Sequence, residues 1–463
     1  MIVMARLLTP VEFGVIGAAM VIISFSEIIS LLGVGPAIVQ IKELTAKHIH
    51  VGYTLSTILA LSVGSIVVLS ASLIAVFFRM PDLKPVIQTL SILFLITGFS
   101  AVSRAQLQRA FQFRVLAIAQ IISFVFGYGM IGICLAYNDW GVWALVNANI
   151  GGSLVNVVLL LIINRKSIGF SLAKKEMYQL MNFGTGFSLA KIANHLALQA
   201  DNIVVGRLLG AEALGIYGRA YGFSTLPASI FGSVVDKVLF PAMSSIQDDK
   251  QRLCSAYSKS VSLIFMFTLP ISGLIFILAH EIIFILLGQQ WMAVVVPVQI
   301  LSLALVFRTA YKMSDTLARA TGAVYRRAWR QWVYAVAVFA GAWAGHFWGL
   351  GGVAVGVSLA IVLNYILMFQ LSVSLIGIKL WDIFISFLRY VLISVLINGL
   401  IFYFIIILKT YHVNSAFILL FGLTVFVALF FTIWRFFHTV FGEEGVWFKS
   451  IIQQKIPWLD KII

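Results

Sequence analysis

Thirteen apolar runs follow one another along this chain, and a helix of about 20 apolar residues is long enough to cross a lipid bilayer. The runs lie at 14–32, 52–77, 86–106, 115–136, 142–163, 179–203, 212–235, 257–287, 294–318, 328–347, 350–374, 384–408 and 415–438. Residues 1–8 resemble the end of a fourteenth run. The sequence therefore predicts an all-α protein that crosses a membrane many times and whose first helix is truncated.

The composition excludes a soluble protein. Of the 463 residues, 61% are hydrophobic and 11% are charged, and a soluble domain does not need so much apolar surface. In a soluble protein, the net charge of +15 would suggest nucleic acid as a partner. In a membrane protein we attribute this charge to basic cytoplasmic loops and to an anionic ligand, and we expect no nucleic acid partner.

A short phrase occurs twice in the chain. Residues 5–20 read ARLLTPVEFGVIGAAM, and residues 206–221 read GRLLGAEALGIYGRAY. One constant offset aligns Arg6, Leu7, Leu8, Gly14, Gly17 and Ala19 with Arg207, Leu208, Leu209, Gly215, Gly218 and Ala220. At a similar offset, Trp140 and Gly141 align with Trp348 and Gly349. Duplication in a very apolar chain is typical of transporters, because two facing half-bundles create a cavity at the middle of the bilayer.

The repeat predicts two six-helix lobes and two extra helices. The first lobe is 1–164, with the remnant of helix 1 and five spans, and the second lobe is 179–375, with six spans. Because each copy has an even number of helices, the two copies have the same orientation and form a parallel repeat. A basic linker at 165–178 joins them, and two further helices at 384–438 follow. The tail at 443–463 is either an amphipathic segment at the membrane surface or a frayed basic end.

Lysine and arginine residues are distributed unequally between alternate loops. Twenty of them lie in one set of loops and in the C-terminal tail, against five in the other set. Loops with an excess of positive charge stay in the cytoplasm. We therefore expect the linker, the loop at 33–51 and the C-terminus to be cytoplasmic.

No enzyme motif is present in the sequence. The chain lacks a GxxxxGK[ST] loop for nucleotides, a GxSxG elbow for a nucleophilic serine and, inside the spans, a pair of histidines at metal-ligand spacing. Cys134 and Cys254 have no partner spacing for a metal site or a disulfide framework. We expect a protein that is not an enzyme and that needs no cofactor and no metal.

Charged residues inside the apolar spans are the first candidates for a functional site. A lone charge at the bilayer centre costs about 2.5–3.5 kcal/mol or more, so it should face protein or water. Lys191 lies near mid-depth of its span, and Asn194, His195 and Asn202 follow it on one helical face. We expect this face to line a hydrated lumen. The alternatives are a structural ion pair of Lys191, with Glu27 as one candidate partner, or a misplaced span.

A second set of charges follows one face of a later span. Its members are Arg308, Lys312, Asp315 and Arg319. Their spacing of four, three and four residues places them on one helix face with a net positive charge. Arg308 and Lys312 are lumen candidates, and Arg219, about two turns into its own span, is another. The alternative is that the four side chains extend to the cytoplasmic surface and pair through Asp315.

Titratable groups among these residues are candidates for coupling transport to an ion. They are Glu27, Asp201, His195 and Asp315. Across the candidate sites, basic residues outnumber acidic ones. That balance favours an anionic cargo, since cations form charge-assisted hydrogen bonds with phosphate.

Three phrases of the sequence resemble one known family. They are ARLLTPVEFG near the start, DNIVVGRLLGAEALGIYGRAY in the middle and LFPAMSSIQDD at 239–249. Together they resemble the Wzx-type polysaccharide flippases of the multidrug/oligosaccharidyl-lipid/polysaccharide exporter superfamily, and within it the branch that exports colanic-acid-like and exopolysaccharide repeat units. The resemblance covers nearly the whole chain. The family's first helix should be complete, whereas only about eight residues of it are present here.

The resemblance implies fourteen helices in two six-helix lobes plus two extra helices, and transport by alternating access. It implies a cargo of undecaprenyl-diphosphate-linked oligosaccharide, moved across the bacterial inner membrane from the inner to the outer leaflet. Membrane lipid and polysaccharide polymerase or assembly proteins are the further partners that it suggests. It also implies basic residues in a central cavity, in the general position of Lys191, Arg219 and Arg308.

Two other functions stay open from the sequence. A drug or cation antiporter of the same superfamily requires mainly acidic residues in its lumen. A scaffold protein of a polysaccharide assembly complex requires no transport, and the truncated start is compatible with it.

Overall fold

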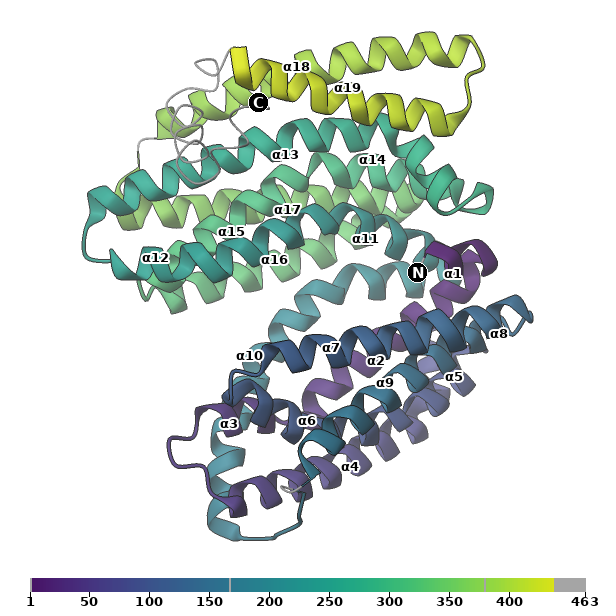
Figure 1. The fold of residues 1–463 in the computed structure, drawn as a ribbon, viewed down its shortest axis with the longest axis vertical. Helices are drawn as coiled ribbons and strands as arrows, with labels where there is room; N and C mark the ends of the chain where they lie inside the picture. Colours follow the sequence, from purple (N-terminus) through teal and green to yellow (C-terminus); the bar gives the residue numbers. More distant parts are fainter. Residues whose placement is uncertain (1, 166–167, 379, 437–463) are drawn as a thin grey trace. The chain divides into compact units, whose positions relative to one another are not determined.

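The structure is a computed structural model, and it describes residues 2–165, 168–378 and 380–436. Side chains are described for all of these residues except 183–194, 197, 233–234, 236–237, 324, 380, 382 and 435–436. Every regular element in this described part is a helix (Figure 1). Within it, nine helices are long and apolar enough to cross a membrane, or ten when the bent pair Gln289–Leu303 and Leu305–Ala320 counts as one span.

Residues 1–218 form the first of two compact units, unit 1. Its helices are α1 (Ile2–Leu7), α2 (Pro10–Leu31), α3 (Val34–Gln40), α4 (Ala46–Phe78), α5 (Leu83–Leu90), α6 (Ile92–Arg109), α7 (Phe113–Phe124), the π-helix η1 (Val125–Gly132), α8 (Ile133–Tyr137), α9 (Val142–Ile163) and α10 (Lys174–Leu208). The next helix, α11 (Gly210–Val234), begins in unit 1 and ends in the second unit.

Residues 219–463 form the second compact unit, unit 2. After α11 it contains η3 (Val235–Leu239), α12 (Phe240–Ser245), α13 (Lys250–Leu286), η4 (Gln289–Val294), α14 (Val295–Leu303), α15 (Leu305–Ala320), α16 (Val324–Gly345), η5 (His346–Trp348), α17 (Gly349–Ile376), α18 (Leu380–Thr410) and α19 (Ser415–Phe436). Within this unit, α13 packs against α14, α15, α18 and α19 (Figure 1).

The two compact units do not divide where the sequence repeat divides. The sequence predicted the lobe boundary in the linker at 165–178, whereas the units separate inside α11. The reason is that α10, the first helix of the second copy, packs against α2, α3 and α4 of the first copy. The two lobes that the duplication suggests therefore remain a prediction. The tail at 443–463 lies outside the described residues.

As far as the structure describes them, the thirteen apolar runs lie on single helices or on consecutive helices, which confirms the predicted all-α membrane fold. The run at 86–106 is shared by α5 and α6, and the run at 294–318 is shared by α14 and α15. Neither α10 nor α11 is among the described helices that composition alone makes candidates for crossing a membrane. These two helices carry polar residues such as Lys191, Asp201 and Arg219, and polar residues in membrane helices face protein or water.

The start of α2 is fixed by a capping box. The Thr9 hydroxyl oxygen accepts a hydrogen bond from the Glu12 N–H (3.4 Å), and the Glu12 carboxylate accepts one from the Thr9 N–H (2.6 Å). The first N–H groups of a helix have no partner inside it, so this reciprocal pair stabilises the helix end. Pro10 suits the first position because it has no N–H to satisfy.

The two copies of the repeated phrase meet within unit 1, at the start of α2 and the start of α11. A Cβ atom added at Gly14 would overlap the carbonyl oxygen of Ala211, and one added at Gly215 would overlap the carbonyl oxygen of Pro10. The offset that aligns Gly14 with Gly215 also aligns Pro10 with Ala211. The crossing is therefore symmetric with respect to the repeat, and only glycine allows two helix backbones to approach so closely.

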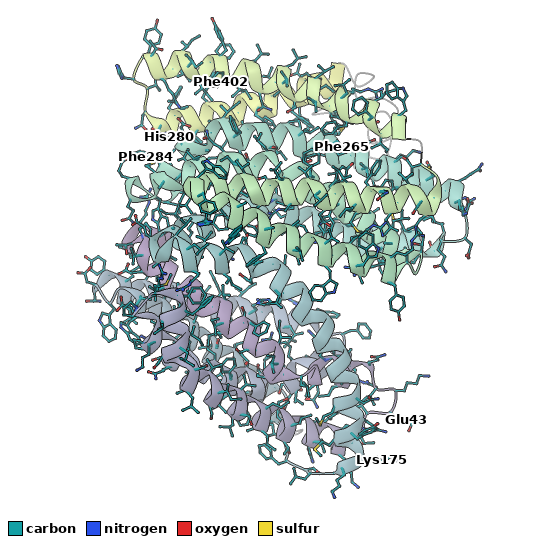
Figure 2. All side chains as sticks on the ribbon, turned by 180° about the vertical axis from the view of Figure 1, so that it is seen from behind. Glu43, Lys175, Phe265, His280, Phe284 and Phe402 are labelled. Atoms are coloured by element: carbon teal, nitrogen blue, oxygen red, sulfur yellow. The ribbon has the colours of Figure 1, made fainter. Side chains whose placement is uncertain are left out.

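Polar contacts attach α18 to α13 in unit 2. The Asn398 side-chain amide donates a hydrogen bond to the carbonyl oxygen of Pro270 in α13 (3.2 Å). Further along α13, Glu281 is 1% exposed and forms an ion pair with Lys409 Nζ (2.7 Å). His280, labelled in Figure 2, lies beside it, with Nδ1 3.6 Å from the Glu281 carboxylate. Hydrogen bonds between membrane helices add to association because lipid offers no alternative partner. These contacts hold the extra helix pair on the body of unit 2.

Candidate functional site

The candidate residues of the sequence divide between the two units. Glu27, His195, Asp201 and Asn202 lie in unit 1, and Arg219, Arg308, Lys312 and Asp315 lie in unit 2. Lys191 and Asn194 belong to α10, but their side chains are outside the part of the chain that the structure describes. The predicted face of α10 is thus described from His195 onward, and the role of Lys191 stays a prediction.

His195 joins α10 to α2. Its Nε2 atom lies 3.1 Å from the hydroxyl oxygen of Ser24, and its ring centroid is 6.5 Å from that of Phe25. The Ser24 hydroxyl donates its own proton to the carbonyl oxygen of Met20 (2.5 Å). The oxygen is therefore left as an acceptor, which assigns the proton of this contact to His195 Nε2. The half-buried ring is held against α2 in this way.

Asp201 and Asn202, two turns beyond His195, make different contacts. Asp201 is 2% exposed, and its carboxylate accepts hydrogen bonds from the Tyr217 hydroxyl in α11 (2.8 Å) and from the Asn202 N–H (2.9 Å). The Asn202 side-chain amide donates to Gln199 Oε1 (2.7 Å). Within the described residues, no group of three or more His, Cys, Asp or Glu side chains is placed to hold a metal ion. Asp201 thus holds the end of α10 against the start of α11, and its coupling role stays a prediction.

Glu27 is half-buried near the end of α2 and lines a cavity of about 250 Å³ between α2, α3 and α6. The α6 wall of this cavity consists of Thr97, Ser100, Arg104 and Gln108, together with smaller residues. These four positions are not among the candidates that the sequence offers, because Arg104 belongs to the basic residues that it assigns to cytoplasmic loops. Their spacing of three, four and four residues is the signal that places them on one helix face. Glu27 therefore shares its cavity with an arginine.

The basic face of α15 lies against aromatic rings and a glycine of unit 2. The guanidinium carbon of Arg308 is 4.4 Å from the ring centroid of Tyr221 in α11. Lys312 Nζ is 5.3 Å from the ring centroid of Tyr311, and the carbon chain of Lys312 lies next to Gly232 in α11. Both cations are half-buried. A cation over an aromatic face is stabilised by about 0.5–2 kcal/mol, so the rings of Tyr221 and Tyr311 stabilise the charges of Arg308 and Lys312.

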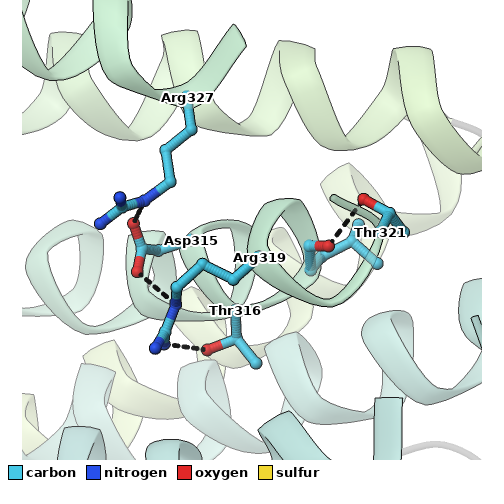
Figure 3. Close-up of polar contacts among 6 residues, drawn as sticks. Asp315, Thr316, Arg319, Thr321 and Arg327 are labelled. Atoms are coloured by element: carbon cyan, nitrogen blue, oxygen red, sulfur yellow. Dashed lines mark hydrogen bonds and ion pairs between the residues drawn. The ribbon is translucent and has the colours of Figure 1, made fainter. Parts of the chain in front are cut away.

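Asp315 is paired with two arginines (Figure 3). It is 6% exposed, and its two carboxylate oxygens lie 3.1 Å from Arg319 Nε and 2.5 Å from Arg327 Nε. Arg319 also donates to the Thr316 hydroxyl (3.2 Å) and lies 5.0 Å from the ring centroid of Phe240 in α12. This arrangement joins α15 to α12 and α16. Asp315 is therefore shared by Arg319 of α15 and Arg327 of α16, and Arg308 and Lys312 add two further cations to α15.

An apolar cavity borders the next face of α15. It has a volume of about 420 Å³ and is lined by Phe307, Tyr365, Phe369, Trp381, Ile383, Phe384 and Phe387. Phe307 precedes Arg308 directly, so one residue of α15 lines the aromatic cavity and the next contacts Tyr221. Arg219, half-buried in α11 two residues before Tyr221, adds a further cation to that helix. The structure therefore brings a cationic face and an aromatic cavity together on α15.

Comparison with known proteins points to one family. The family described as "Polysaccharide biosynthesis protein" matches residues 3–296. The chain is 26% identical over 379 residues to the lipopolysaccharide biosynthesis protein WzxC of Escherichia coli (strain K12), a match that covers 79% of this chain and 75% of that protein. It is 27% identical over 291 residues to the succinoglycan biosynthesis transport protein ExoT of Rhizobium meliloti (strain 1021), covering 62% of this chain and 58% of ExoT.

Two solved structures share the helix arrangement. The lipid II flippase MurJ in an inward closed conformation aligns over 97% of this chain and 96% of that chain, with a TM-score of 0.78 and 15% identity. A multidrug resistance MATE family transporter of the MOP superfamily, in an inward-facing conformation, aligns over 81% of this chain and 92% of that chain, with a TM-score of 0.62 and 17% identity. At these identities, the likeness shows the fold alone.

Proposed function

Because this chain belongs to the family of polysaccharide biosynthesis proteins, we propose that it is a flippase that carries undecaprenyl-diphosphate-linked oligosaccharide repeat units across the bacterial inner membrane. The observation that carries the proposal is the cationic face of α15, where Arg308 and Lys312 lie half-buried in a membrane protein. The relatives with matching sequences are named for lipopolysaccharide biosynthesis and for succinoglycan transport, which supports the same direction.

The cargo explains why a cationic face is needed. A diphosphate and a sugar chain are both polar, and neither can enter hydrocarbon without losing its hydrogen bonds to water. Arg308 and Lys312 can replace that water with charge-assisted hydrogen bonds to phosphate oxygens. An arginine offers a planar fork of donors, and a lysine offers a mobile point charge, so the pair can follow a phosphate group as it moves.

The polyprenyl part of the cargo needs a different surface. We place part of it in the aromatic cavity beside α18, the first of the two helices that follow the second copy of the repeat. Phe307, which lines the aromatic cavity, would contact the apolar part of the cargo, and Arg308, the next residue of α15, would contact the anionic part. The rest of the tail stays in lipid.

The driving force comes from outside the protein in this proposal. The sequence has no nucleotide-binding loop, so either an ion gradient or consumption of the product on the far side drives alternating access. Asp315 is already paired with Arg319 and Arg327. We therefore place proton handling on Glu27, His195 and Asp201 of unit 1.

The orientation and partners follow from the same proposal. The lysines and arginines of the linker, such as Lys175, support a cytoplasmic location for the linker end of unit 1, and Figure 2 shows Lys175 and Glu43 at the same end of that unit. The C-terminus then lies in the cytoplasm as well. Polysaccharide polymerase or assembly proteins would receive the flipped cargo on the opposite side.

Two alternative functions, an antiporter and a scaffold protein, require different properties of these residues. A drug or cation antiporter has fold support, since a MATE family transporter aligns with this chain, but α15 carries three cations, Arg308, Lys312 and Arg319, and one carboxylate, Asp315. A scaffold protein would not need half-buried cations at all. Both rivals predict that charge changes at Arg308 leave polysaccharide export unchanged.

The test uses a bacterial strain whose own exporter of this class is deleted and in which this chain restores polymer export. Without the chain, lipid-linked oligosaccharide should accumulate on the inner leaflet. Arg308→Ala and Lys191→Ala should fail to restore export, whereas Arg252→Ala, which changes an arginine with a 75% exposed side chain on α13, should restore it. Normal export with both Arg308→Ala and Lys191→Ala contradicts the proposal, and a loss of ethidium resistance instead supports the antiporter.

A further inference from the structure

A second polar cavity lies entirely within unit 1, between α6, α7, η1 and α9. Figure 1 shows α6, α7 and α9 side by side in this unit, and they are in contact. The cavity has a volume of about 380 Å³, within the range of about 300–1,000 Å³ that is usual for ligand pockets. It borders the Glu27 cavity along α6, because Thr97, Ser100, Arg104 and Gln108 line both. The cationic face of α15 has no part in it.

The wall of this cavity carries amide and hydroxyl side chains from three helices. They are Thr97, Ser100 and Gln108 on α6, Gln120 and Ser123 on α7, and Asn149, Ser153 and Asn156 on α9. Arg104 is the single charged residue among them, and it donates a hydrogen bond to Asn156 Oδ1 (3.3 Å). A wall of this kind has both donors and acceptors but little charge.

Several of these polar groups have no hydrogen bond in the described part of the protein. The side chains of Gln108, Gln120 and Ser153 make none there. The Asn149 amide nitrogen donates to the carbonyl oxygen of Leu145 (2.9 Å), which leaves its Oδ1 atom available as an acceptor. Polar groups that face hydrocarbon without a partner cost free energy, so the wall must face water or a polar ligand.

The backbone of the wall is adapted to this cavity. The chain between α7 and α8 forms the eight-residue π-helix η1, an arrangement that is rare and frequent at functional sites. Two glycines bring α9 against η1 and α7: a Cβ at Gly127 of η1 would be 2.5 Å from the carbonyl oxygen of Ala148 in α9, and one at Gly152 of α9 would be 3.0 Å from that of Ser123 in α7. Tyr128 of η1 and Phe124 of α7 then supply aromatic rings to an otherwise polar lining.

We propose that this cavity binds sugar rings of the lipid-linked oligosaccharide, an inference that rests on the proposed function. Sugar hydroxyl groups both donate and accept hydrogen bonds. The side chains of Gln108, Gln120 and Ser153 can do the same, and Asn149 Oδ1 can accept. The carbon faces of a sugar ring are apolar and fit the rings of Phe124 and Tyr128. Unit 1 then recognises the neutral sugar part of the cargo, and unit 2 recognises its diphosphate.

Two probe lipids separate the sugar from the diphosphate. The full chain is reconstituted in nanodiscs and titrated with undecaprenyl diphosphate, which has no sugar, and with undecaprenyl diphosphate that carries an oligosaccharide of neutral hexoses. The double variant Gln120→Leu/Asn149→Leu should weaken binding of the sugar-bearing lipid about tenfold, since each neutral hydrogen bond contributes about 0.5–1.5 kcal/mol. The affinity for the sugar-free lipid should be unchanged.

The matched control is Asn147→Leu on α9. Asn147 donates its side-chain amide to the carbonyl oxygen of Trp143 (2.9 Å) just as Asn149 does to Leu145, but it does not line the cavity. This variant should bind both lipids like the unchanged protein. If the double variant does not reconstitute, the single variant Gln120→Met replaces one lining side chain of the cavity with an apolar side chain of nearly the same length. It should lower the affinity for the sugar-bearing lipid only.

The outcomes distinguish this inference from the proposed function. If the unchanged protein binds neither lipid, the proposed function and the inference are both overturned. If it binds undecaprenyl diphosphate, but the sugar adds no affinity or the cavity variants bind the sugar-bearing lipid normally, the sugar site alone is overturned. A selective loss of sugar-dependent affinity, with Asn147→Leu unaffected, supports it.

Discussion

Helix α6 of unit 1 and helix α15 of unit 2 occupy the same place in the two copies of the repeat, yet their polar faces differ. The offset that aligns Trp140 with Trp348 also aligns Ser100 with Arg308 and Arg104 with Lys312. The α6 face has one cation among hydroxyl and amide groups and borders polar cavities. The α15 face has cations against aromatic rings and borders an apolar cavity.

The difference shows how a duplicated fold can acquire two kinds of binding surface. Both copies keep polar side chains at the same depth of the equivalent helix, where they must face protein or water. Where unit 1 has the hydroxyl group of Ser100, unit 2 has the guanidinium group of Arg308, which favours an anion. Apart from Arg104, the polar groups of the α6 face are uncharged donors and acceptors, which suit hydroxyl groups. A cargo with a diphosphate and a sugar chain needs both surfaces.

The largest expected effect is at the cationic side of the comparison. Arg308→Glu replaces the cation with an anion that repels a diphosphate, and polysaccharide export in the deletion strain should fall to the level of the empty vector. Arg308→Lys keeps the charge and should restore a measurable part of export. Export at the normal rate with glutamate at this position would show that α15 does not contact the anionic part of the cargo.

The next largest effect is expected where the two copies are alike. Gly14→Ala adds a Cβ atom that overlaps the carbonyl oxygen of Ala211, so the crossing of α2 and α11 must open. Overpacking of this kind costs about 1–3 kcal/mol, and the thermal midpoint of the protein in detergent should fall. Gly17→Ala is the control, because a Cβ there would meet only Leu214 side-chain atoms at 3.7 Å or more. Equal midpoints for the two variants would mean that the close crossing does not exist.

A third pair of variants compares equivalent positions directly. Lys312→Gln should lower the transport rate about tenfold, the effect of losing one charge-assisted hydrogen bond of roughly 1.5 kcal/mol. Arg104→Gln should lower the rate much less, since glutamine can still donate to Asn156 and to sugar hydroxyls. The rates are compared in the same strain at matched protein levels. If Lys312→Gln and Arg104→Gln lower the transport rate by the same factor, the two copies do not differ in the charge of the group that they bind.

The smallest effect concerns a residue that the first copy lacks. Asp315 aligns with Leu107, so its pairing with Arg319 and Arg327 belongs to unit 2 alone. Asp315→Asn should lower the free energy of unfolding by about 1 kcal/mol, since both arginines are about one-third exposed and solvent screens their charges. Asp248→Asn, at an exposed position, serves as the control for thermal midpoint. If Asp315→Asn abolishes transport without a change in midpoint, Asp315 handles ions rather than holding helices together.

The helices were predictable because lipid imposes a length on them. Each apolar run of about 20 residues must become a membrane helix, and no competing arrangement of those runs exists in a bilayer. The repeat was also visible, and its aligned residues Gly14 and Gly215 lie where the two copies meet. The sequence did not show that α10 packs on the first copy, because the division into units depends on contacts between helices rather than on the duplication.

The sites were predictable only in part, for a related reason. Spacing along one helix identified the face of α15, including Arg308 and Asp315. It could not identify Arg327 on α16 or Tyr221 on α11 as partners, because these contacts depend on how helices pack. The wall of the polar cavity between α6, α7, η1 and α9 could not be predicted, because its polar residues come from three helices, with a few on each, and because the π-helix η1 has no simple pattern in sequence.

The most direct test of the central idea follows the cargo itself across a membrane. Proteoliposomes are prepared with undecaprenyl-diphosphate-linked oligosaccharide in both leaflets, and external periodate, which does not cross the membrane, oxidises only the sugars on the outside. The unchanged protein should expose the inner-leaflet pool to periodate over time, Arg252→Glu should do the same, and Arg308→Glu should leave that pool protected. Equal exposure with Arg308→Glu, or no exposure with the unchanged protein, would contradict a flippase that moves its cargo along the cationic face of α15.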